Sequence, residues 1–302
     1  MTETQEKNPL YIHPENLLSS FQRMGNSLAV TTVRFELKTS HEVRDLDWNH
    51  MDQLHRPCVH HTYQESLRLV VGSSFALSLT RVGKLKLFTL VSDIQLGPGL
   101  FYQGFTLLNL VYVHTVIQVL PEAGGSRITV DSYIVSHRLF KFLHPYLRRR
   151  LLRLNEVQNK EDAPIRDQRT QLRSKGYRFK HDHPDYLNSN TLTPNIMPPK
   201  LEGTHRISLK GVSAKLSKFP AGPIDLLVRR NTDQSFTVWT AVCPHEGGPL
   251  ELGQVCNGNI ICPWHGLSQE GVQLSAERPQ GLSGELQLSL EGEELVVRQL
   301  VL

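Results

Sequence analysis

The chain has 302 residues, 39% of them hydrophobic, and a formal net charge of +4. This length is sufficient for two domains with separate cores, and the composition is that of a globular protein rather than of a disordered or fibrous one. Nothing in the spacing of the four cysteines indicates a disulfide framework, so we expect a reducing, cytoplasmic setting.

Hydrophobic periodicity predicts an antiparallel sheet flanked by helices. A strand over residues 30–37 is followed by a helix over 40–55. Further strands are predicted at 66–71, 75–82, 85–91, 105–120 and 127–136, with a hairpin turn at 122–126. Two helices follow, one over 145–157 and one that begins at Asp162-Ala163-Pro164 and stops near Gly176. This order predicts an α+β domain whose sheet wraps around the last helix and leaves a cavity suited to an apolar ligand.

The first seven residues are polar and lack the apolar stretch of a secretory signal. Residues 94–121 contain no acidic residue, lysine or arginine, which raises the question of a membrane span. Gly97-Pro98-Gly99 interrupts the stretch, and its β-branched and aromatic content favours paired buried strands instead. We therefore expect no membrane span.

The basic excess lies in the first 200 residues. Much of it falls within residues 138–153, where leucines recur at helical spacing. A solvated helix face explains this pattern, and the alternative is a docking site for an acidic redox partner or another subunit. No nucleic-acid-binding motif accompanies the charge, so nucleic acid is not an expected partner.

The proline-containing segment 181–204 is predicted to be a linker. It separates a first domain, residues 1–180, from a second, residues 205–302. The second domain contains Cys243-Pro244-His245 and Cys262-Pro263-Trp264-His265, separated by sixteen residues. Two thiolates and two imidazoles suit a [2Fe–2S] cluster in which one iron has cysteine ligands and the other has histidine ligands. Tetrahedral zinc is the alternative, but zinc fingers usually pair like ligands, whereas each half here has one of each.

A second candidate site lies in the first predicted helix, at Asp47, His50 and His55. Two histidines about one helical turn apart can point into one cavity, and a carboxylate elsewhere would complete a two-histidine, one-carboxylate iron site. An overlapping copy of the spacing exists at Asp52, His55 and His60. Because Pro57 interrupts this second register, we favour the first. Purely structural histidines remain the alternative.

The residues around the cysteine and histidine loops resemble Rieske [2Fe–2S] domains of oxygenases and their ferredoxins. The similar segments are residues 242–250 and 261–266, and the resemblance extends over about residues 206–302. The chain lacks the additional loop cysteines of respiratory Rieske proteins, and Leu267 replaces their hydrogen-bond donor. The resemblance therefore implies a potential toward the low end of the Rieske range, about −150 mV.

The first domain resembles the helix-grip fold of START-like proteins and of Rieske oxygenase catalytic domains. The catalytic domains carry the spacing Asp-x-x-His-x-x-x-x-His, which implies that His50 and His55 bind iron and that Asp47 links this site to a neighbouring cluster. The resemblance also implies a late aspartate as third ligand, and Asp162 is the candidate. A helix N-cap before the following proline is an equally ordinary role for Asp162. In the family the Rieske domain usually comes first, whereas here it is second.

These resemblances imply a Rieske-type oxygenase with a [2Fe–2S] cluster and a mononuclear non-haem Fe(II). It would oxidise an apolar or aromatic small molecule with O2. No nicotinamide or flavin fingerprint is present, so an external ferredoxin or flavin reductase would supply electrons. A homo-oligomer would let electrons cross between subunits. The alternative is a Rieske electron carrier fused to a metal-free domain that binds an apolar ligand.

Overall fold

A computed structural model describes residues 27–60, 63–72, 74–82, 87–108, 110–183 and 195–300, together with residues 19, 21 and 23. The chain divides into two compact units, Met1–Arg166 and Asp167–Leu302. This division falls inside a long helix. Residues 184–194 of the predicted linker lie outside the described residues.

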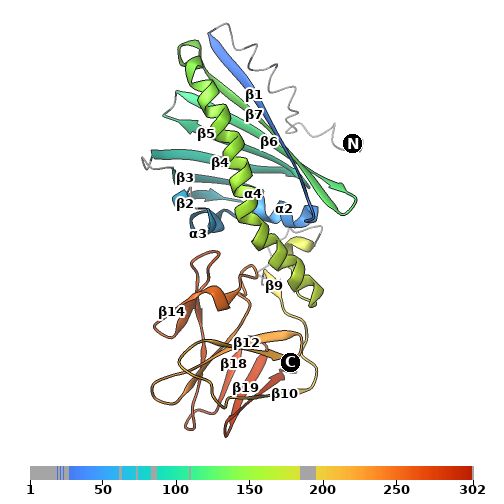
Figure 1. Cartoon of the computed structure of the whole chain (residues 1–302), viewed down its shortest axis with the longest axis vertical. Coiled ribbons are helices and arrows are strands. Elements are labelled where there is room, and N and C mark those ends of the chain that lie inside the picture. The colour runs from blue at the N-terminus through green and yellow to red at the C-terminus, as the bar shows by residue number, and fades with distance from the viewer. Residues whose placement is uncertain are drawn as a thin grey trace. The chain divides into compact units, whose positions relative to one another are not determined.

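The first unit contains a seven-stranded antiparallel sheet of order β1-β7-β6-β5-β4-β3-β2 (Figure 1). The strands are β1 (Leu28–Thr39), β2 (Tyr63–Val71), β3 (Phe75–Val82), β4 (Leu87–Gly97), β5 (Leu100–Leu107), β6 (Val111–Glu122) and β7 (Gly125–His137). The return of β1 to pair with β7 places the first predicted strand at the far edge. The strand predicted over 105–120 is two strands in the structure. The turn between them has Leu108 at a φ of 51°, and leucine gives no turn signal in the sequence.

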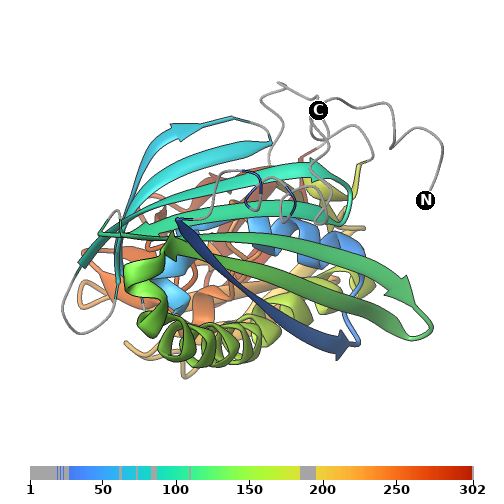
Figure 2. The same cartoon turned by 90° about the horizontal axis from the view of Figure 1, so that it is seen from above.

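Helix α4 (His144–Ser174) crosses the concave face of this sheet, and Figure 2 shows the sheet curving around it. The prediction of two separate helices was wrong, because α4 continues through Pro164. Proline inside a helix removes one backbone hydrogen bond but does not always end the helix. Asp162 is consequently not an N-cap: it lies in the helix interior. The long helix held by a curved antiparallel sheet confirms the predicted helix-grip fold.

Three short helices connect β1 to β2. They are α2 (Val43–Met51), the 3-10 helix η1 (Gln53–His55) and α3 (Arg56–Val59). The helix predicted over 40–55 therefore breaks after Met51. Pro57 lies in the first turn of α3, where proline is tolerated because its missing N–H has no intrahelical partner. The chain turns here, and the turn brings His55 and His60 to the same place.

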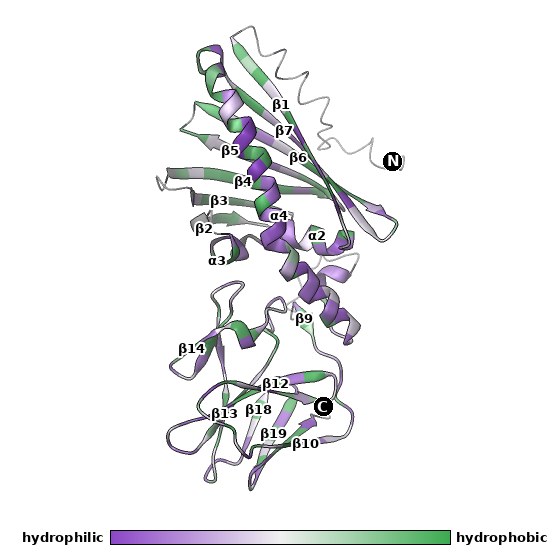
Figure 3. Cartoon of the chain, viewed as in Figure 1, coloured by the Kyte–Doolittle hydropathy of each residue, from purple (hydrophilic) through white to green (hydrophobic). Residues whose placement is uncertain are grey.

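The inner face of β3 and β4 is polar. Ser78, Thr80, Thr89 and Asp93 are buried, whereas the outward Leu90 is exposed. Both strands also contain apolar residues, as the hydropathy colouring of Figure 3 shows. The apolar core of the unit lies instead on β1, β6 and β7, where Val33, Val113 and Ile134 pack against leucines of α4. Burial of polar groups destabilises the fold unless they are hydrogen-bonded, so this polar region indicates a candidate binding site.

After the end of α4, the second unit is a small, mainly β domain, as predicted. Two four-stranded sheets have the orders β10-β20-β19-β18 and β11-β12-β13-β17, and a three-stranded sheet has the order β14-β15-β16. A two-stranded sheet pairs β8 (Arg178–Phe179) with β9 (Ile196–Met197). The strands of the three larger sheets are β10 (Thr204–Ser208), β11 (Ser217–Ala221), β12 (Ile224–Arg230), β13 (Phe236–Thr240), β14 (Gln254–Cys256), β15 (Asn259–Ile261), β16 (Ser268–Glu270), β17 (Val272–Leu274), β18 (Gln280–Ser283), β19 (Leu286–Glu291) and β20 (Glu294–Gln299). Leu226, Val238 and Leu288 are in its fully buried core. Among the described residues, no helix combines the length and apolar character needed to span a membrane.

Candidate metal centres

Two loops of the second unit present the four predicted cluster ligands, and the loops share one backbone pattern. The N–H of Cys243 donates to the carbonyl of Gly248, and the N–H of Gly247 donates back to the carbonyl of Cys243. The N–H of Cys262 donates to the carbonyl of Leu267 in the same way, and the N–H of Gly266 donates back to the carbonyl of Cys262. Each cysteine is therefore fixed at the start of a tight turn.

In these loops the two cysteine side chains lie next to each other, and so do the two histidine side chains. Cys243 and Cys262 are buried, and the hydrogen bond between their sulfurs lowers the pKa of Cys262 to about 4 while it raises the pKa of Cys243. The Nδ1 atoms of His245 and His265 lie 3.3 Å apart. A thiolate pair beside an imidazole pair fits the two unlike irons of a Rieske cluster. A Cβ on Gly248 would lie 2.6 Å from the Cys262 sulfur, so only glycine leaves this space open.

A buried ion pair supports the first loop. The carboxylate of Glu246, which follows the ligand His245, accepts a hydrogen bond of 2.9 Å from Arg169 of α4. Both side chains are buried, and the Arg169 guanidinium stacks 3.7 Å from the Phe179 ring centroid. No sequence pattern signals this pair, because 77 residues separate its members.

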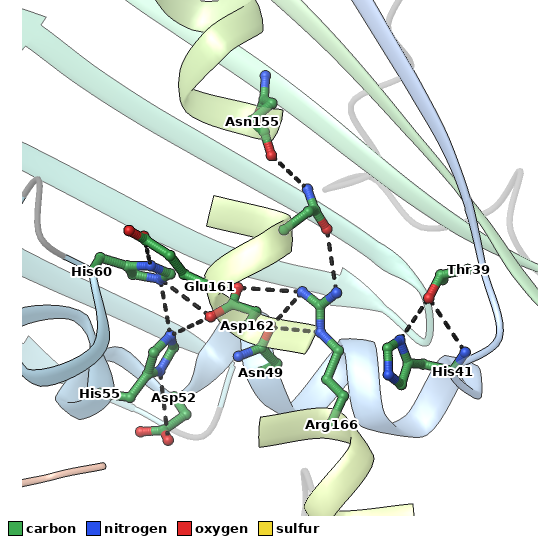
Figure 4. Close-up of polar contacts among 11 residues, drawn as sticks. Thr39, His41, Asn49, Asp52, His55, His60, Asn155, Glu161, Asp162 and Arg166 are labelled. Carbon is green, nitrogen blue, oxygen red and sulfur yellow. Dashed lines mark hydrogen bonds and ion pairs between the residues drawn. The ribbon is translucent and has the colours of Figure 1, made fainter. Parts of the chain in front are cut away.

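In the first unit, the structure brings together His55, His60 and Asp162 (Figure 4). The Nε2 atoms of the two histidines lie 3.3 Å apart. Oδ1 of Asp162 is 3.4 Å from Nε2 of His55 and 3.3 Å from Nε2 of His60. All three side chains are buried. Three ligand atoms that converge in this way fit a metal bound by two histidines and one carboxylate.

The histidine register predicted from the sequence differs from this arrangement. The pair that converges is His55 and His60, and His50 is not part of the three-residue group. His50 instead packs edge-on against Phe101. The preference for His50 and His55 assumes that Pro57 interrupts the second register, whereas Pro57 lies in the first turn of α3, where the chain turns. The overlapping copy of the spacing was the available signal for His60.

Carboxylates also hold the far side of each histidine. Nδ1 of His60 lies 2.8 Å from Oε2 of Glu161, and Nδ1 of His55 lies 3.6 Å from Oδ2 of Asp52. A carboxylate behind a histidine fixes the ring and its tautomer, so that Nε2 presents its lone pair to a metal. No pattern in the sequence predicted this role for Glu161 or Asp52.

The electrostatics of the three-residue group favour an ionised carboxylate. Burial alone would raise the pKa of Asp162, but the hydrogen bond and charge of His55, with the charge of Arg166, lower it well below its usual range. Burial would likewise lower the pKa of His55, but hydrogen bonds to Asp162 and Asp52 raise it to about 9. The group therefore holds a proton between a histidine and a carboxylate, and a metal cation can take the place of that proton.

Asp47 has a different environment from the one the sequence predicted. Both of its carboxylate oxygens lie within hydrogen-bond distance of the Gly99 N–H, at 3.0 and 3.1 Å. Burial raises the pKa of Asp47 to about 7, although the Gly99 bond opposes this. Asp47 thus fixes the turn between β4 and β5 through Gly99.

A cavity of about 80 Å³ adjoins the metal-ligand group. Its apolar lining includes Phe101, Phe105, Ile117, Leu151 and Leu154. A larger number of lining residues are polar: Asn49, His50, His55, Arg56, His60, Asp93, Tyr102, Gln103, Thr115, Ser132, Asn155, Gln158, Asn159, Asp162 and Arg166. The cavity is therefore more polar than the predicted apolar pocket.

Comparison with known proteins assigns the second unit. Residues 207–276 match the family model of the Rieske [2Fe-2S] domain. The second unit contains a Rieske domain. Its role is accordingly iron–sulfur electron transfer or oxidoreduction, and its cluster ligands would be the four residues described above. A search of the curated proteins found no match.

Solved structures similar to this chain cover mainly one part of it. Norcoclaurine synthase from Thalictrum flavum is 15% identical, with 46% of this chain and 84% of that chain covered, at a TM-score of 0.33. A protein from Thermus thermophilus is 12% identical, with coverages of 43% and 93% and a TM-score of 0.37. The di-domain ARO/CYC StfQ of the steffimycin biosynthetic pathway is 10% identical, with coverages of 50% and 53% and a TM-score of 0.38. None of these likenesses bears on function.

Replacement of Arg169 by methionine should destabilise the second unit. The Glu246 carboxylate would stay buried without its counter-charge, which costs about 3–5 kcal/mol. Loss of the cluster's visible absorption during urea denaturation would measure this effect. Lys218→Met is the matched control, because its partner Glu251 is partly exposed and such pairs contribute about 1 kcal/mol or less. Equal midpoints for the two variants would contradict the assignment.

Replacement of Asp47 by asparagine should remove a pH dependence of stability. The pKa of Asp47 is raised from 3.8 to about 7 in the folded chain, so the folded state keeps a proton that the unfolded state loses as the pH rises between these values. Stability of the native chain falls over that interval by an amount on the order of 2–4 kcal/mol. Urea denaturation followed by circular dichroism at pH 4.5 and 7.5 would show a smaller difference for Asp47→Asn. An unchanged difference would refute the buried, protonated state.

Proposed function

We propose that the protein is a Rieske-type oxygenase whose first unit binds a mononuclear iron. The observation that carries this proposal is the buried convergence of His55, His60 and Asp162 in a chain that also contains a Rieske domain. Iron bound by two histidines and one carboxylate has open positions and supplies oxygen chemistry, and the Rieske cluster supplies single electrons. Neither group alone accounts for both sets of ligands.

The chain's own residues prepare the ligand atoms. Glu161 accepts from Nδ1 of His60, and Asp52 lies behind His55, so both imidazoles keep Nε2 free of a proton when a cation is bound. Arg166 is 3.3 Å from Oδ2 of Asp162, which leaves Oδ1 directed at the histidines. Arg166 is itself held by Asn49, whose Oδ1 accepts from both Nε and Nη2. The carboxylate ligand is thus oriented before a metal arrives.

The cavity lining supports a small substrate with both apolar and polar parts. Phe101 and Leu154 offer apolar contact. Nε2 of His50 and Nδ2 of Asn49 are buried and make no hydrogen bond among the described residues, and both residues line the cavity. Burial and the charge of Arg166 lower the pKa of His50 to about 4, so its imidazole is neutral. These two atoms would hydrogen-bond a polar group of the substrate and orient its apolar part.

The electrons would come from an external ferredoxin or flavin reductase, because the sequence carries no nicotinamide or flavin fingerprint. Oxygen would be the co-substrate. The second candidate function is a Rieske electron carrier fused to a metal-free binding domain. It is favoured by the ion pairing of His55 with Asp162, which partly satisfies these groups without a metal.

Iron and acid-labile sulfide should distinguish the two functions. Protein purified and reconstituted without oxygen should contain about three irons for every two sulfides, because one mononuclear iron adds to the [2Fe–2S] cluster. His60→Ala should lose only the additional iron and keep the visible spectrum of the cluster. His50→Ala is the matched control and should retain all three. Two irons for every two sulfides in the unsubstituted protein would favour the electron carrier with a binding domain. Loss of the additional iron in His50→Ala but not in His60→Ala would favour His50 and His55 as the ligand pair.

Replacement of Glu161 by alanine should weaken iron binding in the first unit by about 10–100-fold. The ring of His60 would lose the partner that fixes its Nδ1. Competition with a chelator would measure the affinity, while the cluster spectrum reports on the second unit. Glu156→Ala on the exposed side of the same helix is the control, because its ion pair with Lys160 is on the surface. Equal iron retention by both variants would show that Glu161 does not support the site.

A further inference from the structure

The segment that joins β7 to α4 exposes large apolar side chains. It comprises the 3-10 helix η2 (Arg138–Leu143) and the first turn of α4. Leu139 is 74% exposed, Phe142 72% and Tyr146 61%. Soluble proteins scatter single apolar residues over their surfaces, but three within eight positions form a patch that calls for an explanation.

These side chains are exposed because the opposite side of the same segment faces the core. Leu143, Leu147 and Leu151 pack with Val111 and Ile134 inside the sheet. Residues three or four apart lie on one face of a helix, so the outward face reads Phe142, Tyr146, Arg149 and Arg153 in order. The segment is therefore amphipathic, and its exposed apolar residues lie between Arg138 on one side and Arg149, Arg150 and Arg153 on the other.

The exposed side is also strongly basic. Arg138, Arg149, Arg150 and Arg153 are exposed, and residues 132–155 contain no aspartate or glutamate. In the described part of the chain, none of these four arginines forms an ion pair within 4 Å with an acidic side chain. We define the apolar–basic patch as these four arginines together with Leu139, Phe142 and Tyr146.

The strand register places a further apolar end beside the patch. Val111 pairs with Ser136, one residue before the end of β7. The preceding Leu108 and Leu110 are 62% and 42% exposed. The turn between β5 and β6 therefore lies at the same end of the sheet as η2 and extends the apolar surface there.

We propose that the apolar–basic patch binds the surface of an anionic lipid membrane. Arginines attract anionic headgroups, and exposed leucine and aromatic side chains enter the boundary between headgroups and acyl chains. An acidic redox partner would use the charge, but it would not require Leu139 and Phe142 to project into solvent between the arginines. The two kinds of side chain together match a bilayer surface better than they match an acidic protein. This inference is independent of the proposed oxygenase activity.

The position of the patch suits a protein that takes a ligand from a membrane. Leu151 and Leu154 line the cavity, and Tyr146 precedes them on the same helix by five and eight residues. At about 1.5 Å per residue, these positions lie on the order of 10 Å apart along the helix axis. A membrane-bound patch would thus hold the helix end near a source of apolar small molecules.

Co-sedimentation of the full chain with vesicles tests the proposal. We expect binding to vesicles of phosphatidylcholine with about a third phosphatidylserine and little binding to pure phosphatidylcholine, with a decrease as salt is raised. Arg149→Gln with Arg150→Gln should lower the partition coefficient roughly tenfold or more. Leu139→Ser with Phe142→Ser should lower binding to a similar extent while leaving its salt dependence in place.

The matched controls are Leu282→Ser and Lys210→Gln, both exposed positions of the second unit, and they should bind as the unsubstituted chain does. Circular dichroism and cluster absorption confirm that each variant is folded. Failure of the unsubstituted chain to bind anionic vesicles at low salt would overturn the proposal, as would equal binding by the patch variants and the controls. Binding to a reduced acidic ferredoxin but not to vesicles would assign the patch to a redox partner and would also overturn it.

Discussion

The structure depends on the pairing of buried charges along helix α4. Asp162, Arg166 and Arg169 lie at intervals of four and three residues, and all three are buried. Each would cost several kcal/mol if it stayed unpaired. Asp162 meets the two histidines, Arg166 meets Asn49, and Arg169 meets Glu246. Asp162 belongs to the first unit and Arg169 to the second, so each unit has its own buried charge pairing with a residue of α4.

The cluster ligands could be predicted from the sequence because their information is local. Two short loops contain all four residues, and the loop geometry follows from a few backbone hydrogen bonds. The helix-grip fold could also be predicted, since strand alternation and helical spacing extend over whole elements. Two predicted element boundaries were wrong. Leu108 has a left-handed backbone at a turn where neither glycine nor proline is present, and Pro164 lies inside a helix that it was expected to begin. Tertiary packing overrides local preference at such positions.

The candidate iron site could be predicted only in part from the sequence. The spacing pointed to the segment that holds His55, but it could not choose between His50 and His60 as its partner. The choice depends on whether the chain continues as a helix or turns after Met51, and the turn is decided by packing against β2 and α4. Arg56 illustrates this dependence, since its buried bidentate pair with Asp93 of β4 holds the start of α3 in place. Because 37 residues separate Arg56 from Asp93, no local sequence pattern predicts this pair.

The shift of register also changes which aspartate can act beside a histidine ligand. Asp47 directs both oxygens at the Gly99 N–H, and its raised pKa makes it a poor partner for a cation. Asp52 lies beside Nδ1 of His55, and their mutual attraction contributes to the raised pKa of that histidine. A carboxylate in this position stays ionised when His55 binds a metal through Nε2, because the Nδ1 proton still needs an acceptor. Asp52 therefore lies where a carboxylate can support His55 as a ligand of the proposed metal site, whereas Asp47 fixes the turn at Gly99.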